Sequence, residues 1–249
     1  MLIVGQITTT WAPMHDISVP CANFLTMPVF LLGVALLIVS VVGLIAVLCR
    51  VLILHRVYLF VMLLIITALF TFILFSFIIT IKGPKMENSS GREYRLNDFS
   101  DWLQKHFVGV RDWLGIHCCL VDEDVCDSFG NKLSVLPAAA VWEVITPIES
   151  GCCRPPPQCG YKLKNVSYWE VPKSGLTSRD DDCITWKNDE DTLCFNCDSC
   201  KAGFLLQLRQ DLMILNFLNT FFLIYLIIVL LLGFFSLPNQ LQSDKLSNI

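Results

Sequence analysis

Charged residues are scarce in this chain. Only 16% of its 249 residues are Asp, Glu, Lys or Arg, where a soluble protein has about 25%. No Lys or Arg precedes Arg50, and because a secretory signal peptide starts with basic residues, residues 1–28 match one poorly. The net charge of -4 provides no basic surface for phosphate groups, which argues against nucleic acid as a partner.

Motifs of catalytic sites are absent as well. The sequence contains no phosphate-binding loop, no nucleotide motif and no recognisable Ser-His-Asp set. The acidic runs 180–182 and 190–191 could in principle bind calcium, but a solvated acidic loop is the simpler interpretation. We therefore expect no enzymatic activity, no metal and no cofactor.

Long apolar runs are abundant instead, and 54% of the chain is hydrophobic. Residues 29–49, 57–81 and 212–236 contain no charged residue and no histidine. At a rise of about 1.5 Å per residue, each run can cross the roughly 30 Å hydrocarbon core of a bilayer as a helix. Ionisable residues inside such runs mark transporters and pumps, so their absence argues against transport.

The positions of the basic residues predict an orientation. Residues 50–56, between the first two runs, carry Arg50 and Arg56, and short loops rich in Lys and Arg stay in the cytoplasm. Residues 1–28 and 82–211 are then extracellular. The polar tail 237–249 is cytoplasmic, and Pro238 is expected to end the last helix.

The segment 82–211 is large enough for one small domain. Apolar residues recur at helical spacing over roughly 97–117, which predicts an amphipathic helix, and a weaker helix is expected over 138–149. From 151 to 192 the Pro, Gly, Ser and Asp content is typical of irregular loop. Covalent bonds are expected to substitute for an apolar core in that part.

Cysteine is concentrated in the same segment and indicates an oxidising compartment. Two neighbours, Cys152 and Cys153, cannot easily bond to each other, so each needs a different partner. The prolines that follow them make this stretch a rigid branch point. Ten of the 12 cysteines lie here: Cys118, Cys119, Cys126, Cys152, Cys153, Cys159, Cys183, Cys194, Cys197 and Cys200. With the predicted extracellular Cys21 they number eleven, which leaves one unpaired.

The spacing of Cys194, Cys197 and Cys200 admits other interpretations. Zinc sites use such spacing, and Cys152 with Cys153 could complete one. Redox catalysis by a Cys-x-x-Cys pair is a second alternative, but no thioredoxin-like pattern of strand and helix surrounds the pair. Outside the cell, disulfides are the more common use of such cysteines.

Three residues are candidate modification sites. Asn88 and Asn165 begin Asn-x-Ser triplets on the predicted outer side, where they would be glycosylated; the closeness of Asn88 to the membrane would hinder its modification. Cys49 lies beside Arg50 at the cytoplasmic end of its run. Juxtamembrane cysteines are common palmitoylation sites, and a small buried apolar residue is an equally good interpretation.

Four motifs carry a family resemblance: CANFL at 21–25, GCCRPP at 151–156, CITW at 183–186 and LCFNCDSCKAG at 193–203. With these motifs the sequence resembles the tetraspanins, and specifically their plant-type branch, over about residues 20–236. One feature departs from the family. A tetraspanin has four spans, whereas three are found here, so the chain resembles a plant-type tetraspanin that lacks the first transmembrane span.

The resemblance implies an all-α membrane protein: an antiparallel transmembrane helix bundle with a disulfide-rich, mainly helical large extracellular loop. It also implies that Cys152 bonds to a cysteine near the last span, most plausibly Cys200. Closing such a loop contributes about 4 kcal/mol in the chain-entropy model. The partner of Cys153 stays open among Cys159, Cys183 and Cys194, and Cys118 is the extra cysteine by comparison with the family pattern.

The function that the resemblance implies is a membrane scaffold, palmitoylated and without enzymatic activity, that organises partner proteins in membrane microdomains. Its partners are other tetraspanins, integral membrane proteins and membrane lipids, in homo- or hetero-oligomers. The expected location is the plasma membrane, with endosomal or vesicle membranes as a second site, and the expected processes are cell differentiation or vesicle traffic. One alternative is a channel or transporter subunit, for which Asn216, Asn219 and Thr220 are the only polar cluster in a span. An ectoenzyme would need a catalytic constellation that the loop does not contain.

Overall fold

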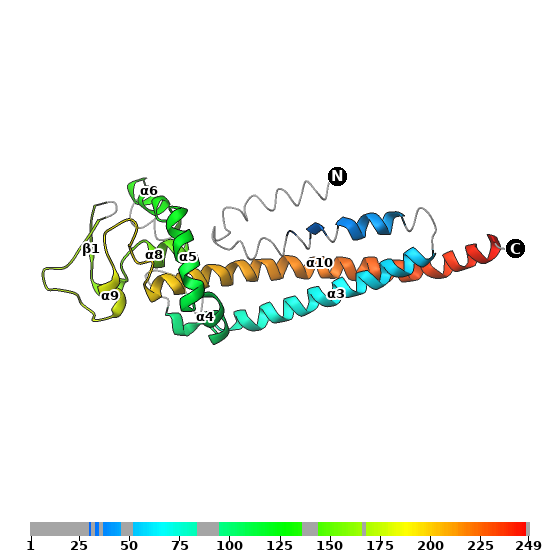
Figure 1. Cartoon of the computed structure of the whole chain (residues 1–249), viewed down its shortest axis with the longest axis horizontal. Coiled ribbons are helices and arrows are strands. Elements are labelled where there is room, and N and C mark those ends of the chain that lie inside the picture. Colours follow the sequence, from blue (N-terminus) through cyan, green and yellow to red (C-terminus); the bar gives the residue numbers. More distant parts are fainter. Residues whose placement is uncertain are drawn as a thin grey trace. The chain divides into compact units, whose positions relative to one another are not determined.

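The computed structural model describes residues 30, 33–34, 37–45, 52–83, 95–135, 144–165 and 168–247. The described part is mainly helical and falls into two compact units (Figure 1). Its elements in chain order are α3 (Leu52–Ile81), η1 (Leu96–Asp98), α4 (Asp101–Phe107), α5 (Val110–Asp122), α6 (Asp127–Val135), α8 (Pro147–Cys152), η2 (Pro157–Cys159), β1 (Lys162–Asn165), β2 (Tyr168–Glu170), α9 (Asp181–Thr185) and α10 (Asp198–Ser247). Long apolar helices and a disulfide-rich helical loop confirm the predicted fold class.

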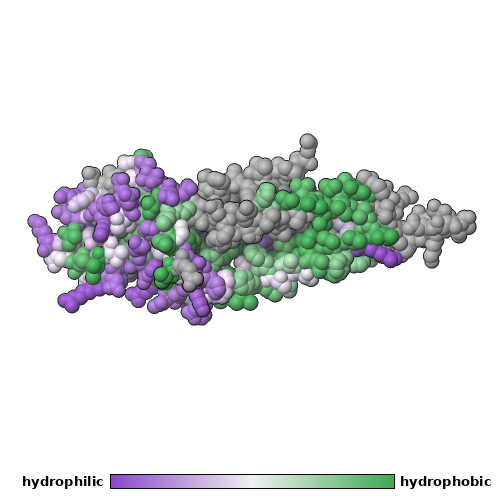
Figure 2. All heavy atoms as spheres, in the orientation of Figure 1, coloured by the Kyte–Doolittle hydropathy of each residue, from purple (hydrophilic) through white to green (hydrophobic). Residues whose placement is uncertain are grey.

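The first unit, called here the helical unit, contains the described residues up to Ile78 and those from Met213 onward. Two helices, Ile53–Ile81 and Asp198–Phe235, are long and apolar enough to cross a membrane. Six side chains form its buried seam: Leu59, Met62, Leu69, Leu223, Leu226 and Leu230. Large apolar side chains cover the outside as well, as the green surface of Figure 2 shows. A helix that is apolar all round suits a lipid environment.

Close approach in the helical unit depends on two glycines. A Cβ at Gly43, in the helical segment 37–45, would overlap the ring of Tyr58 in α3. A Cβ at Gly233 in α10 would overlap Leu59 of α3. Small residues of this kind let helix backbones approach each other closely within membranes.

The ends of the two long helices differ from the sequence-based expectation. α3 begins at Leu52, so His55 and Arg56, expected in the turn 50–56, are helical. The His55 side chain is buried, with Nε2 3.2 Å from the carbonyl oxygen of Gly233. The prediction that Pro238 ends the last helix is wrong, because α10 continues to Ser247. Proline removes one backbone hydrogen bond, and the bonded turns on either side maintain the helix here.

The second unit, called here the disulfide-rich unit, comprises the described residues from Ile79 to Leu212. The single helix predicted over 97–117 is two helices, α4 and α5, separated at Val108 and Gly109. Gly109 has extended backbone angles as the residue before α5, and glycine is a poor helix former. Of the weaker helix predicted over 138–149, residues 138–143 lie outside the described part, and α8 begins at Pro147.

The stretch 151–192, predicted to be irregular, contains short regular elements. β1 and β2 form an antiparallel hairpin, and α9 follows it. Gly160 has φ of 78°, in the left-handed region that favours glycine, and it ends the short helix η2. These elements are too short and too polar to give a clear periodic pattern.

An apolar core supplements the disulfides in this unit. The Trp113 side chain lies edge-on to Phe204, with ring centroids 6.0 Å apart, and its Nε1 donates to the carbonyl oxygen of Phe195 at 3.2 Å. Leu103, Leu120, Phe195, Phe204, Leu205 and Leu208 are buried almost completely. In this core α4, α5 and the start of α10 bury their apolar faces together. The expectation that cysteine bonds substitute for a core concerned residues 151–192 only, and there the buried apolar side chains are mainly cysteines: Cys152, Cys153, Cys159 and Cys183, with Trp186.

Candidate functional site: the disulfide-braced unit

The branch point Cys152–Cys153 is placed by α8. The helix starts with a capping box: Thr146 Oγ1 accepts from the backbone N–H of Glu149 at 3.2 Å, and Glu149 Oε2 accepts from that of Thr146 at 2.8 Å. Pro147 at the first position favours the helical backbone. These contacts fix a six-residue helix that would be unstable alone and bring both cysteines to its C-terminal end.

A partly buried ion pair attaches α6 to α8. Lys132 Nζ lies 2.8 Å and 2.9 Å from the two carboxylate oxygens of Glu149. The Glu149 side chain is only 3% exposed and that of Lys132 27%. The ion pair holds α6, which follows Cys126 directly, against α8.

The adjacent cysteines bond to two different partners. Cys152 pairs with Cys200, with the Cα atoms 4.3 Å apart, and Cys153 pairs with Cys126 at 5.3 Å. The expectation that Cys153 reaches Cys159, Cys183 or Cys194 is wrong. The packing of α6 on α8 brings Cys126 next to Cys153, a contact that cysteine spacing alone does not indicate.

Two glycines allow the backbones of α8 and α10 to come into direct contact where the helices cross. A Cβ at Gly151 would overlap the carbonyl oxygen of Ser199, and a Cβ at Gly203 would overlap that of Pro147. Both obstacles are backbone atoms, which cannot rotate away. The glycine of the GCCRPP motif is therefore a requirement of the close approach that the Cys152–Cys200 bond needs.

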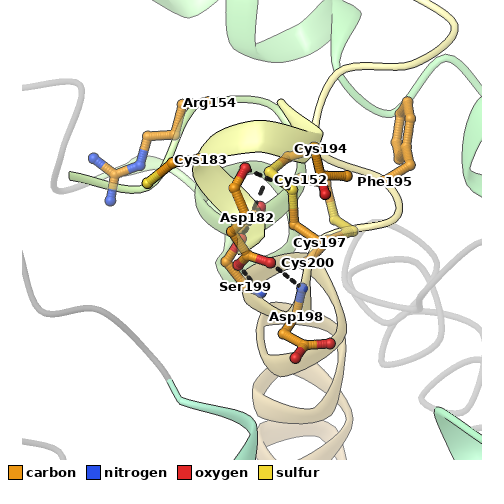
Figure 3. Close-up of a disulfide and its surroundings, with 12 residues drawn as sticks. Cys152, Arg154, Asp182, Cys183, Cys194, Phe195, Cys197, Asp198, Ser199 and Cys200 are labelled. Atoms are coloured by element: carbon orange, nitrogen blue, oxygen red, sulfur yellow. Dashed lines mark hydrogen bonds between the residues drawn. A yellow bond between two sulfur atoms is a disulfide. The ribbon is translucent and has the colours of Figure 1, made fainter. Parts of the chain in front are cut away.

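Asp182 caps the first turn of α10. Its Oδ1 accepts from the backbone N–H of Asp198 at 2.8 Å and its Oδ2 from that of Ser199 at 2.9 Å (Figure 3). A carboxylate at a helix N-terminus satisfies free N–H groups and interacts favourably with the helix dipole. The interpretation of 180–182 as a solvated loop is wrong for Asp182, which is only 8% exposed, whereas Asp180 and Asp181 are exposed.

The remaining cysteines complete the framework. Cys159 pairs with Cys183, and Cys194 with Cys197. Cys119 is also disulfide-bonded, whereas Cys118 is free and exposed; Cys21 lies outside the described residues. No group of three or more His, Cys, Asp or Glu in the described ranges could hold a metal ion. Zinc at Cys194, Cys197 and Cys200 is not supported, because each of these sulfurs belongs to a disulfide.

Comparison with known proteins assigns the chain to a family. The tetraspanin family model matches residues 1–237. The chain belongs to the tetraspanin family.

Among its relatives in Arabidopsis thaliana, Tetraspanin-8 is 39% identical over 233 residues, which cover 92% of this chain and 85% of the relative. Tetraspanin-2 is 37% identical over 193 residues, or 77% and 71% of the two chains. Tetraspanin-11 is 34% identical over 240 residues, or 94% and 88%. No solved structure matches the chain.

Family membership makes the chain a multi-pass membrane protein of a non-enzymatic family whose members interact with other membrane proteins. In this tetraspanin the four described disulfides, the Asp182 cap and the Lys132–Glu149 ion pair hold the elements of the disulfide-rich unit together.

Several other polar side chains form hydrogen bonds that stabilise the structure around them. Thr220 Oγ1 donates to the carbonyl oxygen of Asn216 in its own helix at 2.8 Å. In the disulfide-rich unit, the Tyr161 hydroxyl donates to the carbonyl oxygen of Cys183 at 3.1 Å, and burial raises the pKa of this tyrosine. Arg154 donates to Ser150 through Nε and one terminal nitrogen, at 3.0 Å and 2.9 Å, and so fastens the chain as it leaves α8.

The candidate modification sites are only partly within the described structure. Asn165 is the last residue of β1. Asn88 and Cys49 lie outside the described residues. Glycosylation and palmitoylation therefore stay predictions from the sequence.

Proposed function

We propose that this tetraspanin is a membrane scaffold that holds partner proteins together in membrane microdomains by lateral association. The observation that carries the proposal is the continuity of α10. The helix begins at Asp198, is cross-linked within its first turn through Cys200, and includes the long apolar stretch that ends at Phe235. One helix thus provides both a membrane anchor and a fixed point in the braced unit.

The GCCRPP motif supports assignment to the plant-type branch. In the proposed topology, residues 29–49, 57–81 and 212–236 span the membrane, 50–56 and 237–249 are cytoplasmic, and 82–211 are extracellular. The proposed location is the plasma membrane, with endosomal or vesicle membranes as alternatives, and the proposed processes are cell differentiation or vesicle traffic. Cys49 is proposed to be palmitoylated, and Asn88 and Asn165 to be glycosylated.

The proposal is tested by isolating the tagged full chain from membranes in a mild detergent and identifying co-isolated membrane proteins by mass spectrometry. Cys200→Ser removes the bond at the start of α10, and Cys118→Ser removes a thiol that is free. We expect Cys200→Ser to lose most co-isolated proteins and Cys118→Ser to retain them. Equal retention by both variants, at equal amounts in the membrane, would show that the braced surface does not hold the partners.

A further inference from the structure

A pocket of about 390 Å³ opens in the disulfide-rich unit, among the end of α5, α6, β2 and the segment 188–195. Pockets of roughly 300 Å³ and more accommodate small molecules or single large side chains. Four carboxylates line it: Asp124, Asp127, Glu190 and Asp191. Its lining contains no Lys, Arg or His.

The four carboxylates are all exposed. In the part of the chain that the structure describes, none of them forms an ion pair or a side-chain hydrogen bond. The only lysine of α6, Lys132, is held by Glu149 and does not line the pocket. Four carboxylates with no basic side chain among them give the pocket a negative potential, which attracts a cation.

The walls of the pocket are fixed before anything binds. The Cys126–Cys153 disulfide forms part of the lining. The Asn188 side chain, also in the lining, accepts from the backbone N–H of Trp169 and donates to its carbonyl oxygen, both at 2.8 Å. A preformed site binds without the entropic cost of ordering its own walls.

The spread of the carboxylates suits an extended organic cation better than a metal ion. No group of three acidic, His or Cys residues in the described ranges is close enough to coordinate one metal, so the four carboxylates do not converge on a point. The lining also carries the aromatic ring of Tyr168, which is 51% exposed. A guanidinium group is planar, has five N–H donors, and stacks on aromatic rings.

We propose that this pocket binds an arginine side chain presented by the extracellular segment of a partner membrane protein. The inference rests on the proposed scaffold function, for which it names the partner chemistry. Carboxylates around the opening accept the N–H groups of the guanidinium, and the Tyr168 ring covers its face. Arginine is among the side chains that contribute most binding energy at protein interfaces.

A second pocket of about 410 Å³ provides a contrast. It is lined by Arg95, Asp182 and Asp198 among others. Asp182 accepts two backbone N–H groups and Asp198 pairs with Lys201 at 2.8 Å. Because these charges are already satisfied by protein groups and Arg95 contributes a positive charge, this pocket does not attract a cation.

The test uses the full chain in nanodiscs and a short glycine-rich peptide that carries one arginine beside a photoreactive diazirine. The control peptide has citrulline, which keeps the shape of arginine but has no charge. After irradiation, mass spectrometry maps the labelled residues. We expect the arginine peptide to label the segments 124–131 and 188–195 at least five-fold more than the citrulline peptide does.

The pocket variant is Asp127→Asn with Glu190→Gln, and the matched control is Asp112→Asn with Glu123→Gln, two exposed acidic residues outside the lining. Labelling should fall at least five-fold in the first and stay unchanged in the second. Intact disulfides, checked by mass spectrometry without reductant, establish that both variants fold.

Equal labelling by both peptides, or by both variants, would overturn the arginine pocket. This result is distinct from failure of the scaffold function. If the pocket variant still co-isolates the same membrane proteins as the unmodified chain, the pocket is wrong and the scaffold stands. If even the unmodified chain co-isolates none, the scaffold itself is wrong.

Discussion

Single residues set the distance between α8 and α10. Gly151 in α8 faces the backbone carbonyl of Ser199 in α10. Gly203 in α10 faces that of Pro147, the first residue of α8. The sequence shows a glycine beside two cysteines but not which backbone it faces, because that partner lies 48 residues away along the chain, at Ser199. Asp182 is similar: nothing in the run 180–182 distinguishes it from its neighbours, since its partners are 16 and 17 residues further on.

Gly151→Ala is predicted to destabilise the disulfide-rich unit. The new methyl group would overlap the Ser199 carbonyl, and forcing extra atoms into a packed site costs about 1–3 kcal/mol. The matched control is Gly115→Ala in α5, where an added Cβ meets no atom within 4 Å; it should be neutral or stabilise by about 0.5–1 kcal/mol. Thermal unfolding of the purified chain in detergent measures both. A Gly151→Ala melting temperature equal to that of Gly115→Ala would show that the helices do not approach so closely.

Asp182→Asn is predicted to weaken the start of α10. The amide keeps the size of the carboxylate, but it replaces one acceptor by a donor and removes the charge that faces the helix N-terminus, at a cost of about 1–2 kcal/mol. Asp181→Asn, at an exposed position one residue earlier, should leave stability unchanged. Hydrogen exchange of the Asp198 and Ser199 amides reports the effect directly. Unaltered protection of these amides in Asp182→Asn would contradict the cap.

At the scale of elements, long apolar runs predict the helices that the structure contains, whereas short polar segments do not predict their own secondary structure. The runs 57–81 and 212–236 predict most of α3 and much of the described α10, because twenty or more apolar residues permit few other structures. The sequence does not predict the break at Gly109, since the apolar pattern continues through it. It does not predict the hairpin β1–β2 either, because three or four residues per strand give no periodic signal.

The partner of Cys153 depends on how two elements pack. Cysteine spacing leaves its choice open. In the folded chain Cys126 lies next to Cys153, and the ion pair Lys132–Glu149 joins α6 to α8 beside this bond. A Thr-x-x-Glu capping box is visible at 146–149, so Glu149 could be assigned to a helix start from sequence. Its second role, as the buried acceptor for Lys132, cannot be read from the sequence, because the two residues lie on different helices.

Lys132→Met is therefore predicted to loosen α6. It leaves the buried Glu149 carboxylate without its cation, at a cost of about 1–3 kcal/mol, because Lys132 itself is partly exposed to solvent. Lys132→Met with Glu149→Gln removes the uncompensated charge and should recover part of the loss. Limited proteolysis between α5 and α8 and the yield of the Cys126–Cys153 disulfide measure the change. If the single variant resists proteolysis like the unmodified chain, the ion pair is not what positions α6.

At the scale of the whole molecule, composition alone indicates the class of protein. Scarce charge and long apolar runs indicate a membrane protein, and ten cysteines in one polar segment indicate an oxidising compartment. Orientation rests on Arg50 and Arg56 alone, by the positive-inside rule. That inference needs a direct test on intact cells, and the odd cysteine of the disulfide-rich unit provides one.

Cys118 is free and exposed in a segment that the proposed topology places outside the cell. A membrane-impermeant maleimide applied to intact cells should therefore label the chain, because an exposed thiol reacts through its thiolate. Cys118→Ser should abolish this labelling. The disulfide-bonded cysteines of the unit do not react, Cys21 is predicted from the sequence to be disulfide-bonded as well, and Cys49 is on the cytoplasmic side in the same topology. Labelling at Cys118 after permeabilisation of the plasma membrane alone, with vesicle membranes left intact, would invert the orientation. The disulfide-rich unit would then face a reducing compartment in which its cross-links could not persist, so the arginine pocket and the scaffold surface depend on this result.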